Sequence, residues 1–420
     1  MAGQAKGLWK DPKFRRFWLA RIASNTGSGI TTTVVPVIVV VTLHASTAAL
    51  GILNALGIFP ALVLGIPAGI WVDRRRRTMV VMVAADLICC ASVLAIPALY
   101  HFHLLSLAAV LGSVALTNVV TLLFQHSAAT QMPLVVEHEG NMTQAVSLLK
   151  LQNALGTVGG PTFAGALLAV IAAPFALLVD AASYLVSAFN LSRINTRPRQ
   201  PEQTDHRITV RTYTEPLKWL YETRELRRFT AAYGTAVGLA GALFAVYPYL
   251  AIRDLLMSPG EYAGSIAMLG VGGVVAAFSA PRVIERLGQR RAVLLGLSAF
   301  PIIAIVLTVL RVHGPLAFAF ASLAWFVVGL LSPIADIVGE SWMFRHVRGE
   351  QLGRVNGGLT TFLMSGQLLG ALGAGMLAAA IGVRAVLWVL TVASILLFVA
   401  TRMFPPIADP TPEVAEVPVG

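Results

Sequence analysis

Four carboxylate residues stand within stretches of the chain that are otherwise long and apolar. They are Asp86, Asp180, Asp336 and Glu340. A carboxyl group held away from water favours its protonated form, so a change of surroundings can make it bind or release a proton. The chain has no phosphate loop of the Gly-xxxx-Gly-Lys-Ser/Thr type, which argues against direct nucleotide hydrolysis. The chemistry that these residues favour is therefore coupling to an ion, with protons as the expected ion.

The elements that must position these acids are membrane-spanning helices. Hydrophobic residues make up 56% of the 420 residues and charged residues only 12%, a composition that one soluble core could not hide. Windows of about 20 mainly apolar residues predict twelve spans, and the fold class is therefore an all-α membrane protein. The spans are expected near residues 16–42, 46–72, 78–98, 103–126, 144–171, 173–193, 228–254, 260–281, 292–312, 315–340, 352–381 and 383–404.

The chain repeats its landmarks at an interval of 212 residues. Residues 11–17 read DPKFRRF and residues 223–229 read TRELRRF, and each segment leads into an apolar run with a proline, Pro36 or Pro248. At the same interval, Asp73 and Arg74 correspond to Glu285 and Arg286. The repeat predicts two pseudo-symmetric halves of six helices, an arrangement typical of secondary transporters with a site between the halves.

The repeat also sets the expected domain boundaries. Residues 1–195 form the first six-helix half and residues 226–404 the second. Between them, residues 196–225 predict a polar linker that ends in an amphipathic helix on the membrane surface. The proline-rich residues 405–420 are expected to be a disordered tail.

The positions of the basic residues predict the orientation in the membrane. All of the 31 Lys and Arg residues except Arg253, Arg311 and Arg384 lie on one side of the predicted spans or close to that side. Lys and Arg next to spans stay cytoplasmic, so both termini are expected in the cytoplasm. The net charge of +11 then follows from this topology and from contact with anionic membrane lipids, and nucleic acid is not an expected partner.

Cysteine and histidine residues indicate no cofactor chemistry. Cys89 and Cys90 are neighbours inside the third predicted span, where they cannot form an extracellular disulfide framework. His101 and His103 provide two ligands, which are too few for a metal site. No cleaved leader, metal or cofactor is expected.

Polar residues within several spans are candidates for a cavity wall. Asn118, Thr121 and Gln125 share one helical face, and Asn25 lies in the first span. With the aromatic residues Phe244, Tyr247 and Trp325 they favour a large, weakly polar cargo. Trp325, Asp336 and Glu340 also share a helical face, although the two acids could instead pair with Arg345 or Arg348.

One loop carries the motif of a known family. Residues 69–77 read GIWVDRRRR and match the pattern of the major facilitator superfamily between its second and third spans, except that Arg76 replaces a glycine. The segments 159–165, 180–187 and 353–357 resemble a bacterial exporter branch, that of the macrolide-efflux and enterobactin-exporter proteins. The resemblance runs nearly from end to end.

The resemblance implies a gate at the motif. Asp73 would contact the start of span 11 and close the cytoplasmic side, with Gly69, Arg74 and Arg77 completing the motif. Glu285 and Arg286 would form the counterpart in the second half. The alternative is that the arginines only enforce topology.

A second segment is similar to the antiporter motif of this superfamily. Gly156, Gly160, Pro161 and Gly165 stand at its positions, with Ala164 in place of one glycine. Glycines four apart allow close helix approach, and proline kinks the span. The family uses the motif where the halves meet, and it is typical of exporters. Ordinary packing of small residues, as at Gly366 and Gly370, is the alternative.

The resemblance also ranks the acids. Spans 1, 4, 7 and 10 of the superfamily line its cavity, which makes Asp336 the best coupling candidate. Asp86 and Asp180 would then be polar contacts within the first half, and Cys89 stands where relatives often place an arginine partner for the acid of span 3. The acid frequent in span 1 and the basic residue frequent in span 4 are both missing.

The expected protein is not an enzyme but a secondary active exporter, a proton antiporter of drugs, antibiotics or a secreted natural product such as a siderophore. It is expected to be monomeric in the inner membrane of a bacterium, with protons, lipids and a small-molecule cargo as its partners. Uptake or lipid translocation is an alternative within the same fold. A non-transporting receptor or scaffold is the alternative from another class.

Overall fold

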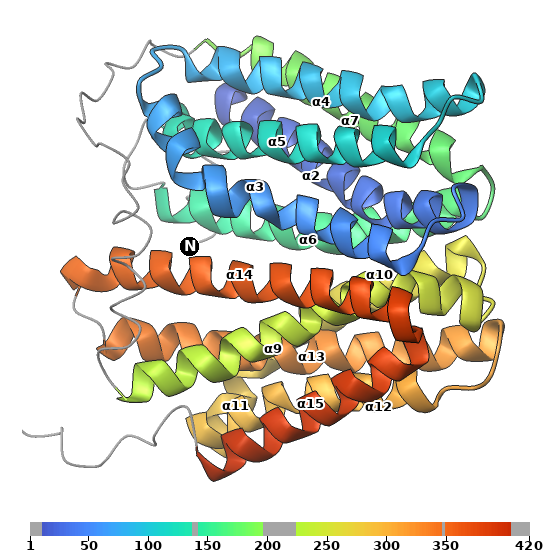
Figure 1. Cartoon of the computed structure of the whole chain (residues 1–420). Helices are drawn as coiled ribbons and strands as arrows, with labels where there is room; N and C mark the ends of the chain where they lie inside the picture. The colour runs from blue at the N-terminus through green and yellow to red at the C-terminus, as the bar shows by residue number, and fades with distance from the viewer. Residues whose placement is uncertain (1–10, 137–141, 196–223, 347–348, 405–420) are drawn as a thin grey trace, which may run out of the picture.

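The computed structural model describes residues 11–136, 142–195, 224–346 and 349–404. The first half contains α2 (Pro12–Val37) with the π-helical turn η1 (Ile38–Thr42), α3 (Thr47–Asp73), α4 (Thr78–His101), α5 (Leu107–Val135), α6 (Met142–Leu168) and α7 (Ala173–Ser192). The second half contains α9 (Arg224–Tyr249) with the π-helical turn η3 (Leu250–Asp254), α10 (Pro259–Leu287), α11 (Gln289–Leu297), α12 (Ala299–Val309), α13 (Pro315–His346), α14 (Gly349–Ile381) and α15 (Val383–Met403). Figure 1 shows the two halves as two bundles packed side by side.

The predicted all-α fold with two six-helix halves is confirmed. Eleven spans in the described part of the chain are long and apolar enough to cross a membrane, and α6 adds the shorter apolar stretch Val158–Leu168. The ninth span is divided into α11 and α12, because Pro301 has no amide hydrogen for the carbonyl four residues earlier. The fourth span continues to Val135 rather than ending near residue 126, since the polar Gln131 is buried and donates to the Thr78 hydroxyl at 2.6 Å. The linker and tail predictions fall almost entirely outside the described residues.

The interval of 212 residues is visible in the backbone. Each first helix contains its proline, Pro36 or Pro248, and then passes into a π-helical turn, Ile38–Thr42 in one half and Leu250–Asp254 in the other. His44 and Leu256 follow these turns with positive φ angles of 50° and 52°. The same local distortion is therefore kept in both halves with different residue types.

Glycine contacts hold helices together within each half. A methyl group placed at Gly160 of α6 would lie 2.5 Å from the Cα of Gly29 on α2. The second half has the same kind of contact between α9 and α14, where a methyl group at Gly370 would lie 2.0 Å from the carbonyl oxygen of Gly238. Small residues permit such close approach of membrane helices.

Contacts between the halves gather at one end of the molecule. The first residues of α2 and the last residues of α15 lie on the left of Figure 1. We call this side of the molecule the terminus end and the opposite side the far end. At the far end, a methyl group at Gly51 of α3 would lie 2.9 Å from the carbonyl oxygen of Ala371 on α14. Gly65 lies nearly four turns further along the same face of α3, and a methyl group there would meet nothing within 4 Å. The two helices therefore diverge towards the terminus end.

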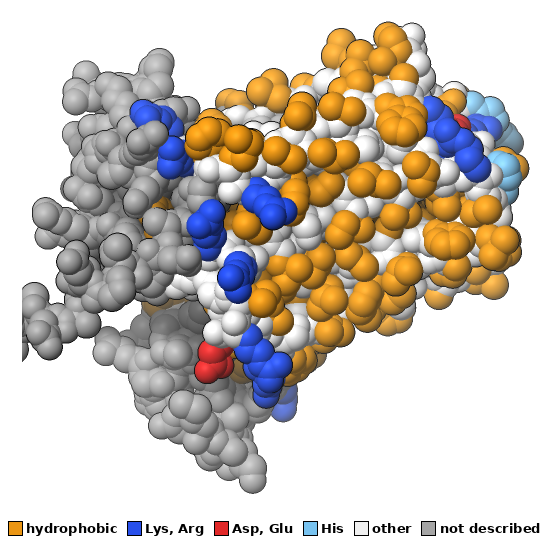
Figure 2. All heavy atoms as spheres, turned by 90° about the horizontal axis from the view of Figure 1, so that it is seen from below, with side chains coloured by type: hydrophobic (Ala, Val, Ile, Leu, Met, Phe, Trp, Pro, Cys, Tyr) orange, Lys and Arg blue, Asp and Glu red, His pale blue; other side chains and the backbone are white. Residues whose placement is uncertain are grey.

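The outer surface of the bundle is apolar. Figure 2 shows hydrophobic side chains over the middle of one face, with Lys and Arg gathered towards its ends. Val170, Phe278 and Leu369 are 81%, 74% and 69% exposed. An exposed apolar belt between charged ends is what a bilayer requires.

Candidate functional site

A polar cavity of about 310 Å³ lies inside the first half. Four helices contribute side chains to its wall: Arg21, Ser24, Asn25 and Ser28 from α2, Asp86 and Cys89 from α4, Thr121 and Gln125 from α5, and Tyr184 from α7. Three of the predicted cavity residues, Asn25, Thr121 and Gln125, thus meet around one of the predicted coupling acids. Asn118 is not part of this wall, and its amide donates to the carbonyl of Val114 in its own helix at 2.9 Å.

The α2 wall of this cavity is a polar stripe along one helical face. Arg21, Ser24, Asn25 and Ser28 follow one another at intervals of three or four residues, which is the spacing of neighbours on a helix surface. From the sequence, Arg21 was expected only as a charge that sets topology. The stripe could have revealed it, because the polar residues after Arg21 recur with the helical period.

Asp86 and Arg21 face this cavity without pairing. The Asp86 side chain is only 2% exposed, and neither its Oδ2 nor the Nε of Arg21 has a hydrogen-bond partner. The described ion pairs, counted to 4.0 Å, do not join these two residues. Buried polar groups are normally paired because desolvation is costly. An acid and a base that each keep an unpaired atom beside one cavity are therefore candidates for binding a proton or a ligand.

Asp180, by contrast, is bonded into the contact between α2 and α7. It is fully buried, its Oδ2 accepts a hydrogen bond from the Thr31 hydroxyl, and its Oδ1 accepts one from Ser183 at 3.1 Å. A methyl group at Gly27 would lie 2.3 Å from the Asp180 carboxylate, so this glycine makes room for the acid. Asp180 therefore makes polar contacts within the first half.

Asp336 lies on the other half, away from the cavity. Its exposed side chain on α13 accepts a hydrogen bond from the Tyr233 hydroxyl of α9. Glu340, one turn later, is also exposed. The side chains of Arg345 and Arg348, its possible partners, lie outside the described residues.

The three predicted aromatic cavity residues form a packed cluster in the second half. Tyr247 and Trp325 are 0% and 2% exposed. The ring of Trp325 lies 4.9 Å from that of Phe244 and 5.1 Å from that of Tyr247, measured between centroids. In this conformation Tyr247 and Trp325 belong to the core rather than to a cavity wall.

The gate motif occupies the turn between α3 and α4. Asp73 is the last residue of α3, and the Arg75 guanidinium stacks 4.2 Å from the ring centroid of Trp71, a favourable cation–π geometry. Gly69 faces His126 of α5, whose ring a methyl group there would approach to 3.5 Å. The predicted contact of Asp73 with the start of span 11 involves side chains before residue 357, which lie outside the described residues.

The remaining gate residues belong to the second half. Glu285 and Arg286 lie in the last turns of α10, directly before Gly288, whose φ angle of 76° ends the helix. They occupy the place in the second half that Asp73 and Arg74 occupy in the first. Arg74 and Arg77 lie on either side of the turn after α3.

The antiporter motif on α6 meets two different partners. Gly156 and Gly160 pack on α2 of the same half, where methyl groups would lie 3.2 Å from Asn25 Cβ and 2.5 Å from Gly29 Cα. Gly165 faces α10 of the other half, 3.4 Å from the Gly260 carbonyl oxygen by the same measure. Pro161 lies inside the helix between these contacts. Val158, between Gly156 and Gly160, also meets the other half, because a methyl group at Gly270 of α10 would lie 2.7 Å from its Cγ2. The motif therefore contacts α2 on one face and α10 on another.

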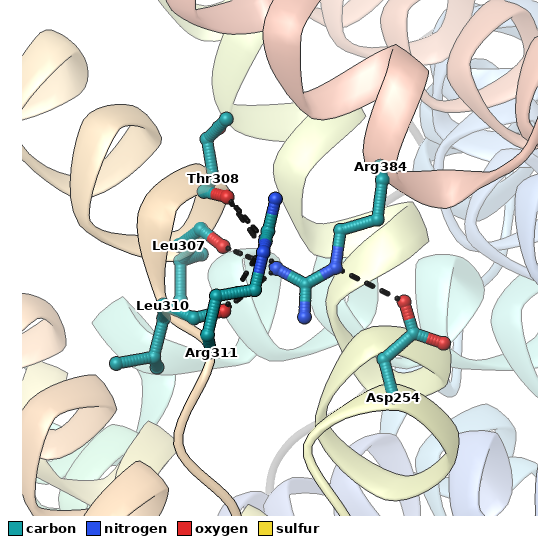
Figure 3. Close-up of polar contacts among 6 residues, drawn as sticks. All are labelled: Asp254, Leu307, Thr308, Leu310, Arg311 and Arg384. Carbon is teal, nitrogen blue, oxygen red and sulfur yellow. Dashed lines mark hydrogen bonds and ion pairs between the residues drawn. The ribbon is translucent and has the colours of Figure 1, made fainter.

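Arg253, Arg311 and Arg384, which were predicted on the opposite side of the membrane from the other basic residues, all lie at the far end. Figure 3 shows Arg384 of α15 donating to the carbonyls of Leu307, Thr308 and Leu310, which end α12, while its Nε lies 3.4 Å from Asp254 Oδ2. Arg311 donates to the Thr308 carbonyl at 2.9 Å. Cations at a helix C-terminus stabilise its unpaired carbonyls. Arg253 instead reaches the first half, donating to the Val40 carbonyl at 2.8 Å.

Two duplicated bundles of membrane-spanning helices, in contact at one end and with a polar cavity inside the first bundle, define a membrane transporter of the major facilitator superfamily. The chain belongs to the family described as transmembrane secretion effector, whose model matches residues 8–415. The resemblance stated from the gate motif is thereby confirmed. Transporters of this family are not enzymes, as the sequence predicted.

Two characterised relatives are similar over most of their length. The multidrug efflux pump Tap of Mycolicibacterium fortuitum is 26% identical over 404 residues, covering 92% of this chain and 94% of the relative. The enterobactin exporter EntS of Escherichia coli O127:H6 is 26% identical over 376 residues, covering 87% of this chain and 85% of the relative.

Solved structures share the fold at low sequence identity. The nucleoside transporter NupG has a TM-score of 0.73 with 12% identity and covers 94% of this chain and 99% of its own. A bacterial homologue of the iron transporter ferroportin in an inward-facing state has a TM-score of 0.73 with 15% identity, and the match covers 93% of this chain and 97% of the homologue. These likenesses support the fold and not the cargo.

Proposed function

We propose that this protein is a proton-driven exporter of small organic molecules that works by alternating access, with Asp86 as its coupling acid. The observation that carries the proposal is that Oδ2 of Asp86 and Nε of Arg21 both lack a hydrogen-bond partner beside one cavity in the membrane. Export as the direction is supported by the names of two relatives, an efflux pump and an exporter. Drugs, antibiotics and siderophores remain the proposed cargo classes.

The proposed orientation places the terminus end in the cytoplasm. It rests on the distribution of Lys and Arg, which stay cytoplasmic next to spans. The halves contact each other at the far end and α3 diverges from α14 towards the terminus end, so the conformation is proposed to be closed to the outside and open to the cytoplasm.

In the proposed cycle, Asp86 takes a proton from the outside and releases it to the cytoplasm. When Asp86 is ionised, the Arg21 guanidinium in the same cavity stabilises its charge, because opposite charges favour the ionised form of an acid. When Asp86 has released its proton to the cytoplasm, the cavity with its ionised carboxylate can bind cargo, and protonation of Asp86 from the outside displaces the cargo, so the cavity holds either the proton or the cargo. Arg21 of span 1 would thus supply the basic residue that span 4 lacks.

Asp336 becomes the second candidate for coupling. Its side chain is exposed and already bonded to Tyr233, whereas Asp86 is buried beside a cavity and has an unpaired oxygen. Asp180 has hydroxyl partners at both oxygens, which favours a role in packing. Intramembrane acids that take part in proton transfer generally face a cavity.

Everted membrane vesicles test the direction and the energy source together. With a proton gradient, vesicles that contain the protein should accumulate ethidium or enterobactin, and a protonophore should release the accumulated probe. Vesicles without the protein are the control. Accumulation in right-side-out vesicles instead would establish uptake, and indifference to the protonophore would contradict proton coupling.

The gate motif gives a separate prediction. A carboxylate at a helix N-terminus contributes roughly 0.3–1 kcal/mol, so Asp73→Asn should weaken the cytoplasmic closure, favour the inward-open state and reduce efflux while expression is retained. Labelling of cysteines in the cavity from the cytoplasmic side measures the population of the inward-open state. Unchanged labelling together with normal transport would remove Asp73 from the gate.

A further inference from the structure

One guanidinium nitrogen joins the two halves at the far end. Nη2 of Arg253, in η3, donates to the carbonyl of Val40 at 2.8 Å and lies 2.9 Å from Nδ1 of His44. Val40 lies in η1, within the last turn of the first helix, where carbonyl groups lack partners in their own helix. A single side chain of the second half therefore binds two groups of the first half.

The contact with His44 requires a particular charge state of the imidazole. A guanidinium group has five donors and no acceptor and stays charged at all relevant pH values. Nδ1 of His44 must therefore be the acceptor, in a neutral ring with its hydrogen on Nε2. Protonation of the ring replaces this lone pair with a second N–H donor and places two positive charges side by side.

Other charged groups near this contact are bonded elsewhere. Asp254, next to Arg253, is paired with Arg384, and Glu261 at the start of α10 accepts from the backbone nitrogen of Ser258. The acid of α7, which packs on η1, is Asp180, and it is held by Thr31 deep in the first half. None of these three carboxylates is bonded to His44, which is exposed and open to protons from the solution at this end.

We propose that His44 and Arg253 form a proton-operated latch on the outer closure of the transporter. Neutral His44 and the Val40 carbonyl hold Arg253 and keep the far end closed. Protonation of His44 from the outer solution removes one of the two bonds and adds repulsion, which favours the outward-open state. The latch rests on the alternating access proposed above, and it opens the transporter to the side where protons are abundant.

Distances across the far end test the latch without any cargo. Spin labels at Leu104→Cys in the first half and Leu316→Cys in the second, both more than 60% exposed in the parent chain (68% and 62%), report the separation of the halves. The full chain is used in lipid nanodiscs with Cys89→Ala and Cys90→Ala. Lowering the pH from 8 to 5 should increase the long-distance population roughly 2- to 12-fold, the effect of losing one hydrogen bond.

Two substitutions separate the latch from other effects of pH. His44→Gln keeps a neutral acceptor at both pH values. The increase in the long-distance population between pH 8 and pH 5 that His44 causes should therefore disappear, and the far end should stay closed. Arg253→Gln should increase the open population at pH 8 and make it insensitive to the charge of His44. His103→Gln is the matched control, because His103 also lies at the far end with a positive φ angle of 57°, and it should respond to pH like the parent chain.

The results that would overturn the latch are specific. A pH response in His44→Gln equal to that of the parent chain, or an unchanged distribution at pH 8 in Arg253→Gln, would each refute it. The same measurement in Asp86→Asn distinguishes the latch from the coupling site, because the response to pH should persist there. A failure of proton-driven export in vesicles would therefore leave this test intact.

Discussion

Asp86→Asn should abolish uphill export driven by a proton gradient while downhill exchange of cargo continues. Asparagine keeps the size of the side chain but cannot take up and release a proton, so the step that couples transport to the gradient is lost and the helices can still alternate. Transport of ethidium or enterobactin in everted vesicles, with and without an imposed pH gradient, separates these two activities. The expected loss of uphill transport is at least tenfold, comparable to about 1.4 kcal/mol.

Asp180→Asn and Asp336→Asn are the controls for this substitution. Asp180 is bonded to Thr31 and Ser183, so its replacement should lower protein level and every transport mode together. Asp336→Asn should retain uphill export. If Asp336→Asn loses uphill export and Asp86→Asn keeps it, coupling belongs to the second half, and if none of the three matters, Glu340 or His126 would have to be tested next.

Gly160→Leu should abolish transport while the protein still inserts into the membrane. Even a methyl group at Gly160 would lie 2.5 Å from Gly29 Cα and 2.6 Å from its carbonyl carbon, and backbone atoms cannot turn aside as a flexible side chain can. α2 and α6 would therefore have to separate, which alters the cavity wall that α2 provides. Overpacking of this kind costs typically about 1–3 kcal/mol or more.

A graded series makes the packing prediction sharper. Gly160→Ala should reduce transport and thermal stability, whereas Gly57→Ala should change neither, because a methyl group at Gly57 meets nothing within 4 Å. Export in vesicles and thermal unfolding in detergent measure both effects. Full activity of Gly160→Leu would show that α2 and α6 do not need this close approach for transport.

The fold was predictable because its main signals are local or repeated. Apolar length defined the spans, and the interval between Pro36 and Pro248 defined the halves. The interruption between α11 and α12 also has a visible signal in Pro301, although one continuous span was predicted near residues 292–312. The π-helical turns had no such signal, since His44 and Leu256 share a backbone conformation but no side-chain chemistry.

The cavity was only partly predictable, because periodicity identifies residues on one helix face but not the direction of that face. Asn25, Thr121 and Gln125, which were predicted for a cavity wall, line the cavity of the first half. Trp325 fitted the same kind of pattern, yet its face is turned into the core, where it is 2% exposed. The hydrogen bond between Thr31 and Asp180 joins residues that are 149 positions apart in the chain. Helical periodicity relates only residues of the same helix, so it could not predict this contact.

The contact made by Arg253 also bears on how the duplicated halves recognise each other. A dimer with two-fold symmetry makes every interface contact twice. At the interval of 212 residues, the counterpart of Arg253 is Val41, a 37% exposed aliphatic side chain, so this contact is made once. The interface has the character of a heterodimer, with one donor and one acceptor subunit fused into a single chain. Halves expressed as separate polypeptides should accordingly assemble as one of each kind rather than with copies of themselves.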